Sequence, residues 1–502
     1  MLNPSQQQAV DFDGRHLLII AGPGTGKTHT LTHRIARLAS GLSGDKAVLA
    51  ITFTNKAAGE LQERLASLNV SGENLTAGTF HRFCLQVLRD HCARAGLSKD
   101  FRVAAPEEIR PLLAARWPEL TQSKLNARLS EISRWKACEA IGEEPGTDVR
   151  EYDAVLSGAG LLDYDDLLWR VWRLWQEQPE VLAGYQRRYA HIFVDEYQDI
   201  NPLQHALLVA LVTDANGITA IGDPNQGIYS FRGADVAYFE RFAEDFPGAG
   251  CLNLAENYRS SAELLSASTQ VIEKFNRFGV PPLTARIYQE GRLLIHTLPT
   301  AAAEAEYVAH QIEKLIGGAS MFSQDSGRVA SHEDQQVSFG DIAVLFRLNS
   351  QQHALRKALD RMGFPCHAAQ PATGDEEDEL CPAAPANIAP AAEKISLLTL
   401  HASKGLEFPV VFMVGCEERL LPLRLEGLPA DPQEERRLFY VGMTRAKRQL
   451  YLLGARKRSI FGQSYRCEPS RYLNDIADHL KSLEDPPPPK RRKAEQQINL
   501  FG

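Results

Sequence analysis

The sequence lacks any apolar run of about eighteen residues, the length that a membrane-spanning helix needs. Its first ten residues, MLNPSQQQAV, contain neither the basic segment nor the apolar core of a signal peptide. The eight cysteines are scattered and form no CxxC pair, which argues against zinc and iron–sulfur sites and fits reduced thiols. A cytoplasmic protein without a membrane partner is therefore expected.

An excess of positive charge is also missing. The chain has 502 residues, with 55 Lys and Arg against 63 Asp and Glu, and a net charge of −8. This balance does not indicate nucleic-acid binding, but it does not exclude it, because a local positive groove sets the relevant field. A hydrophobic content of 44% is ordinary for a globular protein, and the length predicts roughly three domains.

What the sequence does have is a phosphate-binding pattern near its N-terminus. AGPGTGKT directly follows the apolar run 17–20 and precedes a helical pattern, which is the strand–loop–helix setting of a phosphate loop. Glycines let backbone N–H groups face phosphate oxygens, Lys27 can reach the β- and γ-phosphates, and the Thr28 hydroxyl can bind Mg²⁺. The alternative, a chance glycine-rich turn, is disfavoured by the length of the match. The predicted ATP-binding loop comprises Ala21, Gly22, Pro23, Gly24, Thr25, Gly26, Lys27 and Thr28.

Apolar runs that end in polar residues recur along the chain, as is typical of parallel strands. Helical patterns separate them, so we expect an α/β fold with two parallel-sheet cores in tandem. The predicted strands are 17–20, 48–53, 192–194 and 218–221 in the first core, and 342–346, 395–400, 409–414 and 450–453 in the second.

Two segments interrupt this pattern. Residues near 93–170 are predicted to form a helical insertion, and Trp169, Trp172 and Trp175 around its end have a spacing typical of a packed helix face. Residues 367–393 are rich in Pro and Ala and carry an acidic block, which favours a solvated linker.

An acidic pair ends the third predicted strand in HIFVDEYQD. There Asp195 suits Mg²⁺ binding and Glu196 suits activation of the attacking water. Such a pair is often only a helix cap, but a phosphate loop on a neighbouring strand favours the catalytic interpretation.

The next strand ends in AIGDPNQGIYSFRGA. The amide of Gln226 can sense a γ-phosphate, because it both donates and accepts hydrogen bonds. Tyr229, Phe231 and Arg232 suit stacking on unpaired bases. Core aromatics are the alternative, and a loop rich in Gly and Ser disfavours it.

In order along the chain, these motifs and others resemble those of the UvrD/Rep/PcrA group of superfamily-one helicases. The further matching segments are LNPSQQQAV (2–10), AITFTNKAAGEL (50–61), GTFHRFCLQVLR (78–89), LLDYDDLL (161–168), ENYRS (256–260), HASKGLEFPVVF (401–412) and EERRLFYVGMTRAK (434–447). The resemblance implies two RecA-like P-loop domains and an ATP- and Mg²⁺-dependent DNA helicase that moves 3′-to-5′ on single strands in DNA repair or replication.

The resemblance also implies roles for single residues. Gln6 would contact adenine, Tyr258 would stack on it, and Glu407 would contact the sugar. Arg259 and Arg445 would be arginine fingers. The implied catalytic set is Lys27, Asp195, Glu196, Gln226, Arg259 and Arg445. The implied DNA contacts are Asn55, Phe80, His81, Tyr229, Phe231, Arg232, Arg347, Asn349 and His401.

The chain departs from the group in three places. His29 stands where the group often has a base. A domain-sized helical insertion of the relatives is reduced to the linker 367–393. The tail 481–502 ends in a pentapeptide resembling the one that enters the pocket of the replicative sliding clamp, and its predicted contacts are Gln497, Ile498, Leu500 and Phe501.

The predicted domain limits follow from these motifs and interruptions. The first core takes in 1–92 and 171–254, and the second takes in 255–366 and 394–480, with 93–170, 367–393 and 481–502 as insertion, linker and tail. Two alternatives to a helicase remain. One is a single-strand translocase that displaces bound proteins without efficient unwinding. The other is a non-enzymatic clamp-tethered adaptor, which the intact catalytic set disfavours.

Overall fold

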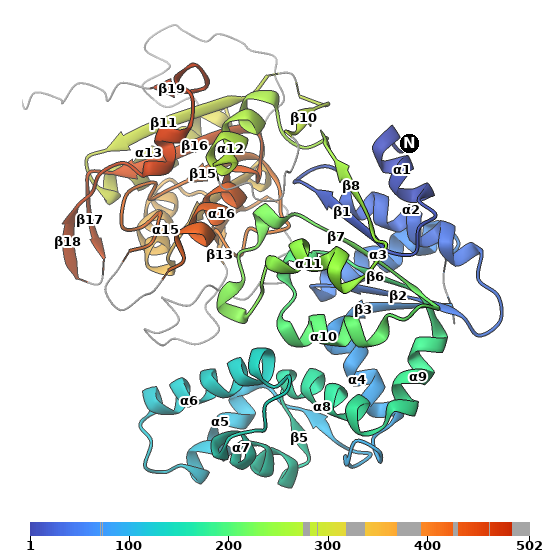
Figure 1. The fold of residues 1–502 in the computed structure, drawn as a ribbon. Helices are drawn as coiled ribbons and strands as arrows, with labels where there is room; N and C mark the ends of the chain where they lie inside the picture. Colours follow the sequence, from blue (N-terminus) through green and yellow to red (C-terminus); the bar gives the residue numbers. More distant parts are fainter. Residues whose placement is uncertain are drawn as a thin grey trace, which may run out of the picture. The chain divides into compact units, whose positions relative to one another are not determined.

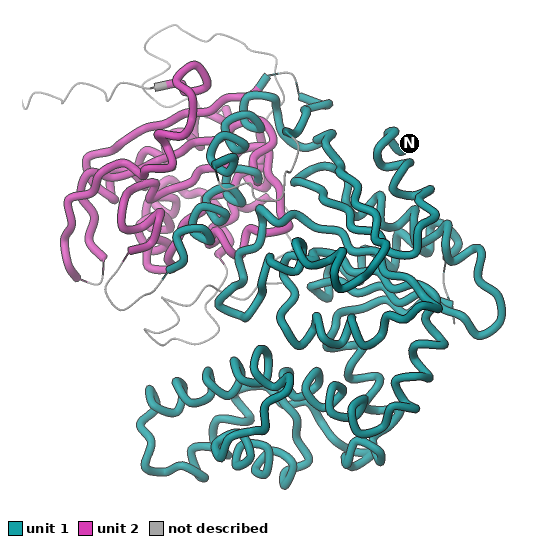
Figure 2. The backbone as a smooth tube through the Cα atoms, in the orientation of Figure 1, with its two compact units in different colours: residues 1–290, 385–387, 430–444 teal, residues 291–384, 388–429, 445–502 magenta. Residues whose placement is uncertain are grey.

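The structure, a computed structural model, divides into two compact units (Figure 2). It describes residues 1–70, 72, 74–274, 282–288, 290–317, 337–368, 393–424, 430–460 and 462–483. Of these, residues numbered up to 290 together with 430–444 form the first unit, and the others form the second. This division differs from the predicted domain limits, because 255–290 and 430–444 group with the first unit. Those limits stay a prediction.

A six-stranded parallel sheet forms the centre of the first unit, in the order β3-β2-β6-β7-β1-β8 (Figure 1). The four strands predicted from the sequence are present and occupy the middle of this sheet, where long apolar runs are buried on both faces. The strands are β1 (Leu17–Ala21), β2 (Ala47–Thr52), β3 (Leu75–Thr79), β6 (Tyr189–Val194), β7 (Gly217–Gly222) and β8 (Gly250–Leu254).

Helices cover both faces of this sheet (Figure 1). Alternate residues of β1 point to opposite sides: Leu17 and Ile19 belong to one buried cluster, while Leu18 and Ile20 belong to the other. The helices of the unit outside the insertion are α1 (Pro4–Asp11), α2 (Lys27–Ser40), α3 (Asn55–Ser67), α4 (Phe80–Asp90), α10 (Pro202–Leu211), α11 (Ala237–Asp245), α12 (Ala262–Glu273) and α16 (Pro432–Met443).

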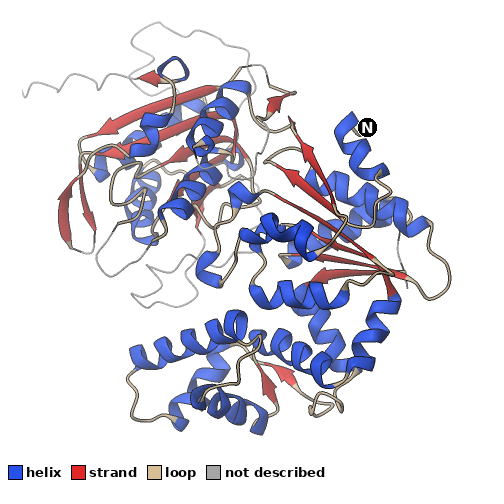
Figure 3. Cartoon of the chain, in the orientation of Figure 1, coloured by secondary structure: helices blue, strands red, loops and turns tan. Residues whose placement is uncertain are grey.

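The predicted helical insertion is helical in the structure (Figure 3). Trp169 and Trp175 are buried and Trp172 packs partly against the same cluster, so the predicted packed face is confirmed. Lys136 lies at the centre, wholly buried, with its Nζ 2.5 Å from Asp166 and 3.1 Å from Asp163. The helices of the insertion are α5 (Pro106–Arg116), α6 (Gln122–Arg134), a π-helix (Trp135–Glu139), α7 (Thr147–Gly158) and α8 (Tyr164–Glu177), which runs past the predicted limit at 170; α9 (Pro179–Arg188) lies beyond that limit.

The second unit contains a seven-stranded parallel sheet in the order β13-β14-β12-β15-β16-β11-β19. Its four predicted strands are present, so the predicted α/β class is confirmed for both units. The strands are β11 (Arg292–Leu298), β12 (Ile342–Phe346), β13 (Cys366–Ala368), β14 (Ile395–Thr399), β15 (Phe408–Met413), β16 (Ala446–Ala455) and β19 (Ser482–Leu483). Two helices, α13 (Ala301–Leu315) and α15 (Gln352–Arg361), pack together in the same core.

Within the described part of the chain, no helix is both long enough and apolar enough to cross a bilayer. The predicted linker lies almost wholly outside the described residues, and the clamp-binding pentapeptide lies entirely outside them.

Candidate active site

The phosphate loop joins β1 to α2, as predicted. Gly24 and Gly26 have φ angles of +69° and +80°, a left-handed backbone that favours glycine. A Cβ at Gly24 would lie 2.5 Å from the Cβ of Arg259, and one at Gly26 would lie 2.6 Å from the Nε2 of Gln6. Among the described residues no side chain caps α2, so its first N–H groups point toward the loop, where an anion would bind.

Gln6 holds the loop from the neighbouring helix α1. Its Nε2 donates to the Thr25 carbonyl at 3.0 Å, while its Oε1 accepts from the backbone N–H of Asn3 at 2.9 Å. The hydroxyl of Thr25 in turn donates to the Gly22 carbonyl at 2.8 Å. The structure therefore gives Gln6 a role in shaping the loop, and its contact with adenine stays a prediction.

The acidic pair follows β6 and faces the loop lysine. The Nζ of Lys27 lies 4.0 Å from an Oε2 of Glu196. Burial and the neighbouring Glu196 carboxylate raise the pKa of Asp195 to about 7, although Lys27 acts to lower it. Glu196 has a φ of +50°, which is uncommon for a residue other than glycine and is a strain found at functional sites. The structure thus brings together the three residues that the sequence assigned to catalysis at these two strand ends.

Gln198 connects the ends of β6 and β7, a role that was not predicted from the sequence. Its Nε2 donates to the Glu196 carboxylate, and its Oε1 accepts from the backbone N–H of Asp223 at 2.9 Å. Asp223 in turn accepts from the Nε2 of Gln226 at 2.7 Å. Gln198 and Asp223 are wholly buried, and burial raises the pKa of Asp223. The available signal was its position two residues after Glu196 within the polar segment DEYQD.

The segment around Arg259 also packs on the phosphate loop within the first unit. Asn257 donates its Nδ2 to the Pro23 carbonyl at 2.6 Å, and the Tyr258 N–H donates to the Gly24 carbonyl at 2.7 Å. The Tyr258 ring is 37% exposed, so its face is accessible to a base. Roles for Tyr258 and Arg259 were predicted from the sequence but none for Asn257, whose Oδ1 also accepts from the Arg259 N–H at 2.9 Å.

A divalent cation fits the donors at this site. Thr28, at the start of α2, offers a hydroxyl and Asp195 offers a carboxylate, while Mg²⁺ in such sites completes its shell with phosphate oxygens and water. The raised pKa of Asp195 reflects a buried carboxylate that a cation would stabilise in its charged form. Within the described ranges, no group of three or more His, Cys, Asp or Glu side chains is arranged to hold a metal ion by itself, so the remaining ligands would come from the nucleotide and water.

The residues predicted to bind nucleotide in the second unit lie near the beginning of β15. Arg445 is buried and its Nη1 donates to the Leu406 carbonyl at 3.1 Å. Glu407 lies 2.7 Å from the Nζ of Lys447. Both are therefore held by neighbours in their own unit, and their contacts with ATP stay predictions.

Three predicted DNA contacts lie beyond the ends of the paired strands β12 and β14 in the second unit. Arg347 and His401 are buried, and Asn349 begins a short 3₁₀ turn. The turn is held by Gln351, whose Oε1 accepts from the Arg347 N–H at 3.0 Å. Because parallel strands end at one edge, the structure places these three residues at the same edge of the sheet.

Of the aromatics predicted to stack on bases in the first unit, only Phe231 presents a largely exposed ring, at 49%. Tyr229 is buried and stacks on Phe53 with ring centroids 5.2 Å apart, so the expectation that this loop holds no core aromatic was wrong. Phe80 is buried in the core because it opens α4 on that helix's apolar face. The DNA contacts of Tyr229 and Phe80 stay predictions.

The remaining predicted DNA contacts of this unit are polar. Arg232 is exposed, with its guanidinium carbon 5.6 Å from the Phe231 ring centroid. Burial lowers the pKa of His81 to about 4, so its ring is neutral at physiological pH. Asn55 is the first residue of α3.

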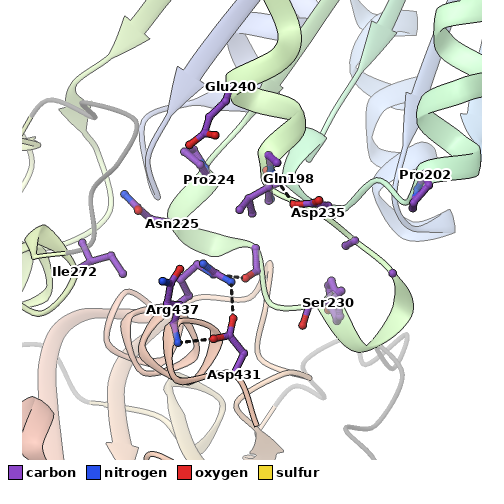
Figure 4. Close-up of a pocket in the computed structure, with 17 residues that line it drawn as sticks. Gln198, Pro202, Pro224, Asn225, Ser230, Asp235, Glu240, Ile272, Asp431 and Arg437 are labelled. Carbon is purple, nitrogen blue, oxygen red and sulfur yellow. Dashed lines mark hydrogen bonds and ion pairs between the residues drawn. The ribbon is translucent and has the colours of Figure 1, made fainter. Parts of the chain in front are cut away.

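Beside this loop lies a cavity of about 440 Å³ (Figure 4). Loop residues 224–237 form one wall, and the start of α16 contributes Asp431, Gln433 and Arg437 to another. Ile272 of α12 also lines it. The cavity therefore adjoins both the loop that carries Phe231 and the helix that precedes Arg445.

Two family models match most of the chain. The UvrD/REP helicase N-terminal domain matches residues 2–247, and the UvrD-like helicase C-terminal domain matches 252–372 and 381–457. Three similar proteins are DNA helicase II of Salmonella typhimurium, ATP-dependent DNA helicase PcrA of Bacillus subtilis and DNA helicase II of Escherichia coli. Their identities to this chain are 27%, 28% and 28%; they cover 95%, 98% and 95% of it and 87%, 88% and 87% of their own lengths.

These alignments also contain a length difference. The alignment with the Bacillus protein runs over 651 positions, whereas this chain has 502 residues, so the relative carries residues without a counterpart here. The second family match breaks between 372 and 381, inside the predicted linker.

Proposed function

Because this chain belongs to the UvrD-like helicase family, we propose that it uses ATP to move 3′-to-5′ along single-stranded DNA and to unwind duplex DNA in repair or replication. The chain is an ATP-driven DNA helicase. The proposal adds the direction, the biological task and the roles of individual residues.

The observation that carries the assignment of residues is the position of Lys27, 4.0 Å from Glu196 at the mouth of the phosphate loop. Backbone N–H groups of the loop and the Lys27 ammonium would bind the triphosphate. Glu196, held by Gln198, would accept a proton as water attacks the γ-phosphorus and the bond to ADP breaks.

Cations would stabilise the negative charge on the phosphates during phosphoryl transfer. Thr28 and Asp195 would hold Mg²⁺, which neutralises charge on the phosphates when bound. Arg259, placed against Gly24, and Arg445 would add guanidinium charge as the terminal phosphoryl group transfers.

The first experiment measures ATP hydrolysis alone and with oligo(dT), duplex DNA or RNA. We expect oligo(dT) to stimulate hydrolysis most, and duplexes with a 3′ single-stranded tail to be unwound in preference to those with a 5′ tail. Lys27→Ala is the control, because it removes the phosphate-binding charge and should abolish both activities. Equal rates with and without every nucleic acid would contradict the proposal.

A second candidate function is favoured by the length difference from the relatives. In this alternative the chain translocates on single strands and displaces bound proteins but separates duplexes poorly, since the insertion that its relatives carry is reduced here. Translocation on oligo(dT) and unwinding of a tailed duplex are measured side by side. Fast translocation with weak unwinding supports the translocase, and efficient unwinding by the same preparation supports the helicase.

We also propose that the tail binds the replicative sliding clamp through Gln497, Ile498, Leu500 and Phe501. An extended peptide with a Gln anchor and apolar side chains suits a hydrophobic pocket. Deleting residues 496–502 should abolish binding of the chain to the clamp and leave DNA-stimulated ATP hydrolysis intact. Unchanged clamp binding would end this proposal.

A further inference from the structure

Asn3 connects the two residues that are predicted to recognise the adenine base. As the N-cap of α1, it accepts at Oδ1 from the backbone N–H of Gln6 at 2.8 Å, and its own N–H donates to the Gln6 side chain at 2.9 Å. Its Nδ2 donates to the hydroxyl oxygen of Tyr258 at 2.9 Å. One amide side chain therefore links α1 to the tyrosine that follows β9 (Glu256–Asn257).

The Tyr258 hydroxyl makes a second hydrogen bond. It donates to Oε2 of Glu256 at 2.7 Å, while Oε1 of Glu256 accepts from Nη2 of Arg286 at 3.0 Å. The bonds from Tyr258 and Arg286 hold the pKa of Glu256 below its usual range, so this carboxylate is charged at neutral pH. The four connected side chains form the tyrosine network: Asn3, Tyr258, Glu256 and Arg286.

Arg286 enters this network from a short strand beside the phosphate loop. The strand β10 (Thr284–Ala285) pairs with β9, and the N–H of Arg286 donates to the Asn257 carbonyl at 2.9 Å. Directly before β10, Leu283 lies over Gly22 of the loop, where an added Cβ would come within 2.8 Å of the leucine Cδ1. The same segment thus contacts the phosphate loop and supports the tyrosine network.

Both ends of Tyr258 are fixed by these bonds. Its backbone N–H donates to the Gly24 carbonyl at 2.7 Å, and its hydroxyl is bonded to Asn3 and Glu256. Tyr258 is 37% exposed, so packing alone does not hold its ring in one rotamer. A ligand that needs one rotamer must order the side chain when it binds, and that ordering lowers its affinity. The bonds to the hydroxyl remove this cost in advance.

We propose that Asn3, Glu256 and Arg286 are positioning residues that hold the Tyr258 ring in the orientation in which it stacks on the nucleotide base. This inference rests on the proposed function, because it assumes that Tyr258 stacks on adenine. The tyrosine network sets the affinity for the base, whereas the phosphate loop binds the triphosphate. None of the three residues touches the nucleotide in this scheme, since each acts through the Tyr258 hydroxyl, Arg286 by way of Glu256.

The central test is Tyr258→Phe, which removes the hydroxyl and keeps the ring. We expect KM for ATP, measured by hydrolysis with oligo(dT) present, to rise about two- to tenfold, the size expected when one side chain must be ordered on binding. The kcat should stay close to that of wild type. Inorganic tripolyphosphate, which has no base, is measured as a competitive inhibitor. Its inhibition constant should not change, because the phosphate loop is intact.

Variants of the three partners should also raise KM. Asn3→Asp keeps an oxygen that caps α1 but loses the donor to Tyr258. Glu256→Ala removes the acceptor, whereas Glu256→Gln keeps a carbonyl oxygen and should raise KM less. Arg286→Ala removes the group that holds the carboxylate. All four variants should unfold close to the wild-type temperature, because a half-exposed ion pair contributes little to stability.

The matched control is Arg94→Ala. Arg94 is 51% exposed, as is Arg286, and it pairs with Glu180 of α9 at 3.3 Å, outside the tyrosine network. Loss of this pair should leave KM for ATP unchanged. A second comparison is Tyr258→Ala, which removes the ring itself and should raise KM by more than Tyr258→Phe does.

The outcomes separate the two proposals. An unchanged KM in Tyr258→Ala overturns the proposed stacking role of this residue, and with it the premise of the positioning role. A raised KM in Tyr258→Ala with an unchanged KM in Tyr258→Phe overturns the positioning role alone. Equal weakening of ATP and tripolyphosphate binding in Tyr258→Phe would also overturn it, since that pattern is expected when the phosphate loop itself is displaced.

Discussion

At the scale of single residues, burial and a neighbouring charge change the pKa of a carboxylate in the candidate site. Asp195 is nearly buried beside a second carboxylate, and this raises its pKa to about 7. The acid form cannot serve as an anionic ligand for Mg²⁺. If Asp195 holds Mg²⁺ as proposed, its ionisation would make metal binding depend on pH near neutrality.

The apparent affinity for Mg²⁺ in ATP hydrolysis should accordingly fall as the pH drops through about 7. Above that value Asp195 is ionised and, if it holds Mg²⁺ as proposed, would bind the cation; below it a proton would compete with the cation. The measurement is a Mg²⁺ titration of the hydrolysis rate at several pH values. Asp195→Asn should need far more Mg²⁺ and lose this dependence. A half-saturating Mg²⁺ concentration that is constant across this range in wild type would contradict the prediction.

The glycines of the phosphate loop give a second test at this scale. Gly24→Ala should abolish ATP binding, because its Cβ would meet the Cβ of Arg259 in addition to the cost of a left-handed backbone. Gly44→Ala is a matched control: its φ is +64° but its Cβ would meet nothing within 4 Å. Gly44→Ala should lose about 1–2 kcal/mol of stability and bind ATP normally in calorimetry, whereas Gly24→Ala should lose more stability because of the added clash. Equal ATP affinities would show that the close approach to Arg259 is unimportant.

At the scale of elements, the short 3₁₀ turn Ser230–Arg232 contains the exposed Phe231 and directly follows the buried Tyr229. Phe231→Ala should weaken single-strand binding by roughly 1–3 kcal/mol with little change in stability, because an exposed ring contributes mainly by stacking on bases. Tyr229→Ala should destabilise the fold by roughly 3–5 kcal/mol, because it empties a buried site. Fluorescence anisotropy with oligo(dT) and thermal unfolding distinguish these effects. The reverse pattern would assign the stacking role to Tyr229.

The strands that could be predicted from the sequence are those with a continuous apolar run. Continuous apolar runs identified β1, β2, β6 and β7, which lie in the middle of the sheet. The edge strands β3 and β8 were missed because LTAGT and GCLNL carry polar and glycine residues where one side faces solvent.

At the candidate site, residues next to predicted strands could be predicted from the sequence, whereas residues held by tertiary hydrogen bonds could not. Lys27, Asp195 and Glu196 stand at the ends of recognisable strands, and their proximity followed from parallel topology. Gln198 and Asn257 act by hydrogen bonds to partners on other elements, and such bonds leave no periodic pattern in the sequence. The burial of Tyr229 depends on stacking against Phe53 from β2's end, a tertiary contact that local composition does not reveal.

At the scale of the whole molecule, the net charge of −8 would repel DNA, whereas the residues predicted to contact DNA include cations such as Arg232. Lysines and arginines that contact DNA phosphates release counterions, so single-strand affinity should fall as salt rises despite the negative total. The measurement is the dissociation constant for oligo(dT) at several salt concentrations. Arg232→Gln should flatten the slope of the logarithmic plot. An affinity that increased with salt would mean that the net charge, and not a local basic surface, controls binding.

The order of the chain has a consequence for biosynthesis. The first unit contains α16, yet the ribosome makes residues 291–429 before it reaches this helix. At typical translation rates that interval lasts on the order of ten seconds. During this time Glu434 and Arg437, which bond to Ser230 and Gly227 in the folded unit, have not yet been made. The nascent first unit therefore cannot fold completely until α16 has been synthesised. Premature termination before codon 444 would release a protein in which the loop predicted to contact DNA lacks part or all of this helix.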